Sequence, residues 1–236
     1  MDFNFGFGKT KMNFNINDKN IIDVLLPNVI EITYKGIEEV KRAMNNPISS
    51  EKLKNIVKKG EKIVIITSDI TRPMPSKTVL PSVLNELYSA GIKDEDIKIV
   101  FALGSHRSQS EEEKKYLVGE EIYKNIKCID SNESGYVKLG TSKSGTPIEI
   151  CKDVAEADRR ICLGNIEYHY FAGYSGGAKA IMPGVSTRAA IQVNHSKMTD
   201  EKSKAGNLDT NPVRIDIEEV EKYVHIDFIL NVVLDE

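Results

Sequence analysis

The chain has 236 residues, of which 40% are hydrophobic and 28% are charged, proportions typical of a globular protein and not of a disordered or repetitive one. Its 32 Lys and Arg nearly balance its 35 Asp and Glu, and the resulting net charge of −3 argues against a protein that binds nucleic acid. No apolar run approaches the roughly 18 residues that a membrane span requires.

The chain opens with FNFGFGKTKMNFNI at residues 3–16, in which apolar and polar residues alternate. The alternation is interrupted at Gly6, Gly8 and Lys9, and it predicts an antiparallel hairpin rather than a signal peptide.

Residues 37–59 read as two short helices with an interruption at Asn46 and Pro47. Ser49 and Ser50 are the residues expected to cap the second helix, because their hydroxyls can accept from free backbone N–H groups.

From residue 62 onward, apolar strands alternate with helices. The predicted strands are Lys62–Thr67, Ile97–Leu103, Lys127–Asp130, Arg160–Gly164 and residues 225–235. The predicted helices cover Ser76–Ala90, ended by Gly91, and a segment that starts within SQSEEEKKYL at residues 108–117. Residues 136–151 read as a hairpin that turns at Ser142–Gly145. This order predicts an α/β fold, a doubly wound, mostly parallel, Rossmann-like sheet with an antiparallel β-hairpin addition.

The three cysteines, Cys128, Cys151 and Cys162, are widely spaced, and no CxxC pair occurs. An odd number in this pattern disfavours a disulfide scaffold and a cysteine zinc site, and we expect a cytoplasmic protein.

Three predicted strands run directly into polar clusters. KIVIIT leads into SDITRPMP, IKIVFAL into GSHRSQSEEE, and RICLG into NIEYHYFAGYSGGAKAIMPG. Because ligands of open α/β sheets bind at the carboxyl ends of strands, we expect the three clusters to meet at one edge of the sheet.

The histidines support a functional site at this edge. Of four in the chain, His106, His169 and His195 lie in or just after these clusters, whereas His225 is expected to be structural. Imidazole titrates near neutral pH, which suits acid–base work. In the first cluster Asp69 is placed to orient a His or a hydroxyl, unless the cluster is simply a capped turn.

Two cationic residues stand in these clusters. Arg72 suits a carboxylate or phosphate, since guanidinium binds both in a bidentate manner. Lys179 lies in the glycine-rich stretch Gly173–Gly184, which fails the P-loop pattern because Ala178 and Ala180 replace its required residues. The stretch still offers backbone N–H groups for one phosphate, and burial among small neighbours would make the Lys179 amine nucleophilic. The simpler interpretation is a flexible loop with a solvated lysine.

Together SDITRPMP, GSHRSQSEEE, NIEYHYFAGYSGGAKAIMPGVS and NHSKM resemble the nickel-dependent lactate racemase family, in which they occur in the same order. The resemblance covers essentially the whole chain and implies one amino-terminal cofactor-binding and catalytic α/β domain over residues 1–236. Members of the family continue into a second, carboxy-terminal domain that this chain lacks.

The resemblance implies a nickel-pincer nucleotide, a pyridinium mononucleotide with thioamide and thiocarboxylate arms. It implies covalent attachment to Lys179, nickel ligation by His195, and acid/base roles for His106 and His169. The residues that it places in contact with the cofactor are Asp69, Ile70, Thr71 and Arg72.

The implied activity is that of an isomerase, a racemase or epimerase of 2-hydroxy acids such as lactate. The Cα hydrogen leaves as hydride onto the pyridinium while a histidine removes the hydroxyl proton, and two histidines serve the two enantiomers. The implied partners are a small 2-hydroxy carboxylate, the cofactor-synthesis proteins and the second domain. Protein from a host without those synthetic enzymes is expected to lack the cofactor. The isolated chain is expected to fold but to racemise weakly or not at all, because the cleft stays open to water.

Two other interpretations stay open. A hydrolase or lyase would hold a simple metal ion on His106, His169 and His195, with no adduct on Lys179. A non-catalytic module would bind a phosphorylated small molecule at the glycine-rich loop, and removal of the histidines would leave its function intact.

Overall fold

The computed structural model describes residues 1–8, 10–26, 28 and 30–234, and the chain forms two compact units, Met1–Tyr34 and Lys35–Glu236. In the first unit, β1 (Asp2–Phe7) and β2 (Thr10–Asn15) pair in antiparallel fashion, which confirms the predicted hairpin. The rings of Phe3, Phe5 and Phe14 stack on one face of it. Lys9, one of the predicted interruptions, lies outside the described residues.

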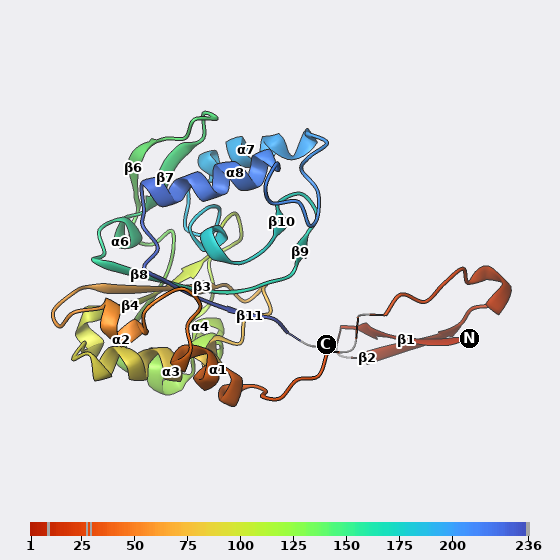
Figure 1. Cartoon of the computed structure of the whole chain (residues 1–236), viewed down its shortest axis with the longest axis horizontal. Coiled ribbons are helices and arrows are strands. Elements are labelled where there is room, and N and C mark those ends of the chain that lie inside the picture. The colour runs from red at the N-terminus through yellow and green to blue at the C-terminus, as the bar shows by residue number, and fades with distance from the viewer. Residues whose placement is uncertain (9, 27, 29, 235–236) are drawn as a thin grey trace. The chain divides into compact units, whose positions relative to one another are not determined.

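The second unit is built on a five-stranded sheet in which every neighbouring pair of strands is parallel (Figure 1). Its strands are β3 (Ile63–Ser68), β4 (Ile97–Ala102), β5 (Lys127–Asp130), β8 (Arg159–Asn165) and β11 (Phe228–Val232). Their spatial order is β11-β8-β3-β4-β5, so the chain winds outward from β3 in one direction and then from β8 in the other. This is the doubly wound order, and its switch point lies between β3 and β8. The predicted fold class is confirmed.

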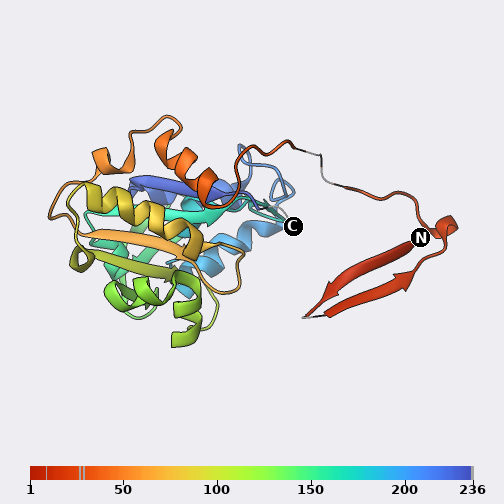
Figure 2. The ribbon, with the colours of Figure 1, turned by 90° about the horizontal axis from the view of Figure 1, so that it is seen from below.

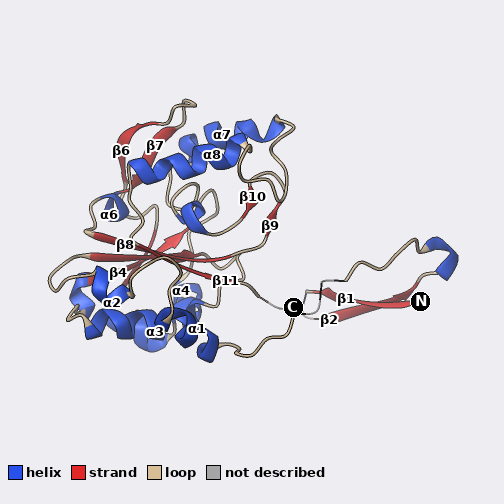
Figure 3. Cartoon of the chain, viewed as in Figure 1, coloured by secondary structure: helices blue, strands red, loops and turns tan. Residues whose placement is uncertain are grey.

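Helices cover both faces of this sheet (Figures 1 and 2). One layer holds α1 (Ile37–Asn45), α2 (Leu53–Ile56), α3 (Ser76–Ser89), α4 (Glu111–Val118) and α5 (Glu120–Asn125). The other holds α6 (Lys152–Ala155), α7 (Arg188–Ser196), α8 (Pro212–Glu218) and the hairpin of β6 (Tyr136–Thr141) and β7 (Pro147–Cys151), as Figure 3 shows. Alternate side chains of β3 feed the two cores, because successive residues of a strand point to opposite faces. Ile63 and Ile65 pack with α3, whereas Val64 and Ile66 pack with α7 and α8.

Two local predictions are wrong. Ser49 and Ser50 do not cap the second helix, which begins at Leu53 after Lys52, with no side-chain cap. Leu53 is fully buried, and the turn that inserts it into the core leaves both serines outside the helix. The last strand begins at Phe228, three residues later than predicted, and the exposed His225 pairs with Glu221 instead.

The helix predicted to start within residues 108–117 is α4. It begins with a capping box, in which Ser110 accepts from the N–H of Glu113 and the Glu113 side chain accepts from the N–H of Ser110. The predicted β6–β7 hairpin is present, with its turn at Ser142–Gly145.

Within the described part of the chain, every helix falls short of the length and apolar character that crossing a membrane requires.

Candidate functional site

A pocket of about 160 Å³ lies where β3, β4 and β8 end. Each of the three polar clusters contributes to its wall, which confirms that they converge on one edge of the sheet. The residues that both line this pocket and were singled out from the sequence are Asp69, Arg72, His106, His169, Lys179 and His195. The pocket therefore sits at the switch point, the position where doubly wound sheets bind ligands.

Asp69 and His106 form a hydrogen-bonded pair at the ends of β3 and β4. Asp69 is buried, and its Oδ2 lies 2.7 Å from His106 Nδ1. Thr71 Oγ1 donates to the other carboxylate oxygen at 2.7 Å. Since a carboxylate only accepts hydrogen bonds, the His106 nitrogen opposite it carries a proton, and in the neutral ring the lone pair is then on Nε2. In that tautomer His106 can accept a proton.

Ile70 and Thr71 support the site rather than line its pocket. The Ile70 N–H donates to Gln109 Oε1 at 2.8 Å, and Gln109 in turn donates from its backbone and side chain to the Asp130 carboxylate. This network ties the loops after β3 and β4 to the end of β5. The role of Ile70 and Thr71 as cofactor contacts stays a prediction.

His169 is held in the opposite state. It ends β9 (Tyr168–His169), which pairs with β10 (Gly173–Tyr174), and its Nδ1 accepts from the N–H of Ala172 at 3.2 Å. Burial, with the nearby charges of Lys179 and Arg72, lowers the pKa of His169 to about 4. At neutral pH the ring is therefore uncharged, with its proton on Nε2, and it faces the pocket as a donor.

Lys179 occupies the short 3₁₀ helix Gly177–Ala180 within the glycine-rich stretch. The turn before it needs glycine at Gly176, whose φ is +78° and where a Cβ would meet the Asn231 side chain at 3.1 Å. Burial, followed by the positive charges of Arg72 and Arg214, lowers the pKa of Lys179 to about 7. Among the described residues no carboxylate lies within ion-pair distance of its Nζ. Near neutral pH much of this amine is uncharged and nucleophilic.

His195 lies in the last turn of α7, which begins with Thr187 accepting from the N–H of Ala190. Its ring meets that of Phe171 edge-on, with 4.9 Å between the centroids. Burial, followed by the charge of Lys179, lowers the pKa of His195, so the ring is neutral and able to bind a metal at neutral pH.

A metal site made of protein side chains alone finds no support. In the part of the chain that the structure describes, no group of three His, Cys, Asp or Glu side chains is arranged to hold a metal ion.

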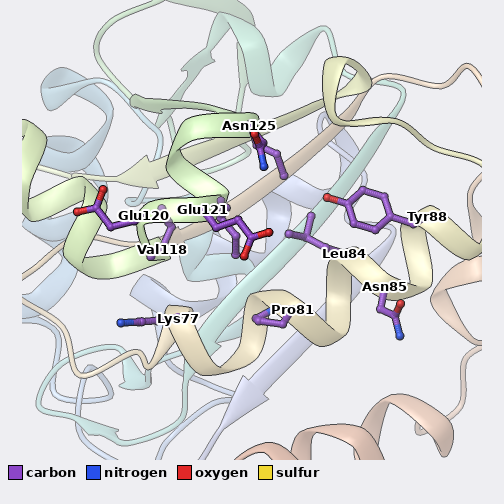
Figure 4. A pocket seen from close by; sticks show the side chains of 12 residues that line it. Lys77, Pro81, Leu84, Asn85, Tyr88, Val118, Glu120, Glu121 and Asn125 are labelled. Carbon is purple, nitrogen blue, oxygen red and sulfur yellow. The ribbon is translucent and has the colours of Figure 1, made fainter.

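A larger pocket, of about 410 Å³, lies between α3 and α5 (Figure 4). Its labelled wall residues are Lys77, Pro81, Leu84, Asn85 and Tyr88 from α3, and Val118, Glu120, Glu121 and Asn125 from the facing segment. The Tyr88 hydroxyl is engaged by Asp94 at 2.5 Å. This groove holds no histidine, whereas three histidines and Lys179 line the pocket at the strand ends.

Fold and site together define a doubly wound α/β domain with a pocket at its switch point, whose wall holds a buried lysine and three histidines. Residues 7–206 match the lactate racemase N-terminal domain, and the chain belongs to that family.

Two curated relatives extend this match. A lactate racemase of Thermoanaerobacterium thermosaccharolyticum is 38% identical over 97% of this chain and 55% of its own length. A lactate racemase of Lactiplantibacillus plantarum is 36% identical over 98% of this chain and 56% of its own length. The chain thus spans about half the length of the curated relatives it matches.

Solved structures agree. The lactate racemase apoprotein from T. thermosaccharolyticum superposes with a TM-score of 0.86 at 36% identity, covering all of this chain and 56% of the other. A Thermotoga maritima protein superposes with a TM-score of 0.69 at 19% identity, covering 86% of this chain and 53% of the other, and it supports the fold alone.

Proposed function

We propose that residues 1–236 form the cofactor-binding and catalytic domain of a racemase or epimerase of 2-hydroxy acids, with lactate or a close relative as substrate. The observation that carries the proposal is the pocket in which Lys179, with a pKa of about 7, is grouped with His106, His169 and His195. The relatives are named lactate racemases, which supports a racemase. Because they are longer than this chain, the proposal includes a second domain that works together with residues 1–236.

The residues present fit a nickel-pincer nucleotide. A neutral amine at Lys179 suits formation of a covalent amide-type bond, and the imidazole of His195 is a donor that nickel(II) accepts readily. Gly164 and Gly176 line the pocket, and the absence of a Cβ at each makes room for the Asn231 side chain. When bound, this group supplies an electron-poor ring that accepts a hydride.

The proton chemistry falls to the two histidines. In the proposed reaction His106 Nε2 takes the proton of the substrate hydroxyl, and the Asp69 carboxylate stabilises the imidazolium that results. His169 Nε2–H donates a hydrogen bond to substrate oxygen from the other side of the pocket. Arg72, whose guanidinium has no carboxylate partner among the described residues, binds the substrate carboxylate. Cofactor-synthesis proteins are the partners needed to load the site.

The test is the intact mass and nickel content of the chain after production in a host that makes the cofactor. We expect an adduct of nucleotide size with about one nickel per chain, since one His and one Lys serve one cofactor. Lys179→Ala is expected to abolish the adduct, whereas Lys204→Ala, which removes an exposed lysine, should retain it.

Two outcomes would contradict the proposal. One is an adduct that persists in Lys179→Ala. The other is binding of a simple metal ion by the unmodified chain that is lost in His106→Ala and His169→Ala, since that pattern belongs to the hydrolase or lyase interpretation.

A further inference from the structure

Asp216, on α8, is the centre of a buried polar network that joins α8, α7 and the β6–β7 turn. It is 2% exposed, and both carboxylate oxygens are saturated with donors. Its donors are Ser142, Ser144 and Thr146 from the β6–β7 turn, Asn194 from α7, and Lys197 just after it. The hydroxyl and amide donors lower the pKa of Asp216 to about 2 in spite of its burial, so it is a carboxylate at neutral pH.

This network fixes the orientation of the Asn194 amide. Asn194 is fully buried, and its Nδ2 donates to Asp216 Oδ2 at 2.7 Å and to the carbonyl oxygen of Val213 at 3.2 Å. Both partners only accept hydrogen bonds. A flipped amide would place its oxygen against two acceptors, so Nδ2 must face them and Oδ1 must face the other way.

The amide oxygen of Asn194 faces His195, with 3.1 Å between Oδ1 and the ring Nδ1. Since an amide oxygen is only an acceptor, the His195 nitrogen opposite it must carry the proton. The neutral ring then has its lone pair on Nε2, the nitrogen left for a ligand of the pocket that His195 lines.

We propose that Asn194, oriented by Asp216, is a positioning residue that holds the His195 proton on Nδ1 and keeps Nε2 bare for metal binding. The tautomer is thereby set before any metal arrives. Partners of this kind beyond the ligand itself commonly control the orientation and basicity of a ligating histidine. The role for metal binding rests on the proposed function, whereas the tautomer itself does not.

The tautomer is measured directly by ¹H–¹⁵N correlation of the histidine rings in the ¹⁵N-labelled chain without cofactor. With four histidines in the chain, His195→Gln identifies the signals of His195. We expect Nδ1–H as its main form in the wild type. The same spectrum supplies an internal contrast, since His106 should also be Nδ1–H and His169 should be Nε2–H.

Asn194→Ala is expected to shift the ratio of the His195 tautomers by about fivefold toward Nε2–H, the effect of losing one hydrogen bond. Asn194→Leu keeps the branching of the side chain at Cγ and should act alike if Asn194→Ala fails to fold. Thr187→Ala is the matched control, because it removes the cap at the opposite end of α7 without touching His195. A wild-type ring with its proton on Nε2, an unchanged ratio in the Asn194 variants, or an equal shift in Thr187→Ala would each overturn the proposal.

A second readout separates this proposal from the proposed function. In chain loaded with cofactor, Asn194→Ala should keep the adduct on Lys179 but bind nickel roughly 10–100-fold more weakly on dialysis against a chelator. Nickel binding equal to that of the wild type would overturn the metal-binding role. If no adduct forms in any variant, the proposed function fails while the tautomer measurement still decides the role of Asn194.

Discussion

At the scale of single residues, the acid–base character of each site histidine depends on the group opposite its Nδ1. His106 faces the Asp69 carboxylate, which makes it an acceptor at Nε2, whereas His169 faces the N–H of Ala172 and becomes a donor there. Two identical side chains thus enter the pocket in complementary states. The proposed reaction, in which one group removes the hydroxyl proton while a second supports the oxygen, would use this pairing.

The reactivity of the Lys179 amine is expected to depend on pH. Its pKa of about 7 implies that an acylating reagent reacts with the cofactor-free chain at Lys179 with a midpoint near pH 7. An ordinary lysine has a pKa near 10.4, so at pH 7.5 the neutral fraction of Lys179 should be several hundred-fold larger. Peptide mass mapping after brief labelling measures this, with the exposed Lys204 as the reference site. A labelling midpoint near pH 10 at Lys179 would contradict the burial argument.

The same shift has a consequence for stability. Because the folded-state pKa lies below the unfolded value, the unfolded chain binds more protons between about pH 7 and 10.5. The cost of burying charged Lys179 is therefore complete below pH 7 and disappears as the pH rises to 10.5. Lys179→Met should be more stable than the wild type in urea at pH 6.5, and the difference should shrink steadily by pH 10.

At the scale of elements, Gln109 joins three connections of the sheet. Gln109 lies in the loop after β4. Its side-chain oxygen accepts from the N–H of Ile70 after β3, and its backbone and side-chain N–H groups donate to Asp130 at the end of β5. Gln109→Ala leaves a partly buried N–H and part of a buried carboxylate without a partner, which costs about 1–3 kcal/mol. Urea unfolding measures the loss.

Variants of two neighbouring serines give reference values for the loss of stability in Gln109→Ala. Ser110→Ala removes the cap of α4 and should cost about 1 kcal/mol. The exposed Ser108→Ala should change the free energy of unfolding by less than about 0.5 kcal/mol. Equal stability of Gln109→Ala and Ser108→Ala would show that the loops after β3 and β4 hold their positions without Gln109.

Elements with a strong periodic pattern are predictable from the sequence, and those defined by distant partners are not. The β-branched runs of β3 and β4 are buried on both faces, so their residue types alone mark them as central strands. α7 and α8 are short, and their sequence has no comparable signal. Asp216 of α8 is held by hydrogen bonds to the β6–β7 turn some 70 residues away, and Asn194 of α7 by a hydrogen bond to Asp216. A helix that starts at Leu53, and not directly after a cap at Ser49 or Ser50, likewise follows from burial in a core that a local pattern does not contain.

The site likewise has features that the sequence predicts and features that depend on the fold. The residue types at the strand ends, together with the rule for ligand placement, are enough to place Asp69, His106 and Lys179 at one edge. Their protonation states depend on contacts made only in the fold, such as the 37-residue separation between Asp69 and His106. Asn194 adjoins His195 in the sequence, which is a usable signal, whereas nothing near Asp216 marks it as a partner of the site.

At the scale of the whole molecule, the pocket at the strand ends is open to water. The side chain of His106 is 37% exposed and Arg72 is exposed, so water reaches both the proposed base and the proposed carboxylate-binding group. Exclusion of water strengthens such interactions and protects reactive species, and the relatives have about as much chain again with which to achieve it.

We therefore expect the 236-residue chain, loaded with cofactor, to fold and bind but to racemise lactate at least on the order of 10²-fold more slowly than the full-length T. thermosaccharolyticum relative. Circular dichroism establishes folding, and a coupled assay with a lactate dehydrogenase specific for one enantiomer measures turnover. The matched control is the relative itself, cut where its alignment with this chain ends. If the cut relative is slow and the intact relative fast, the loss is due to the missing half and not to this sequence. Turnover by the 236-residue chain at the rate of the intact relative would show that this domain closes its own site, because water at His106 would then be no barrier to the reaction.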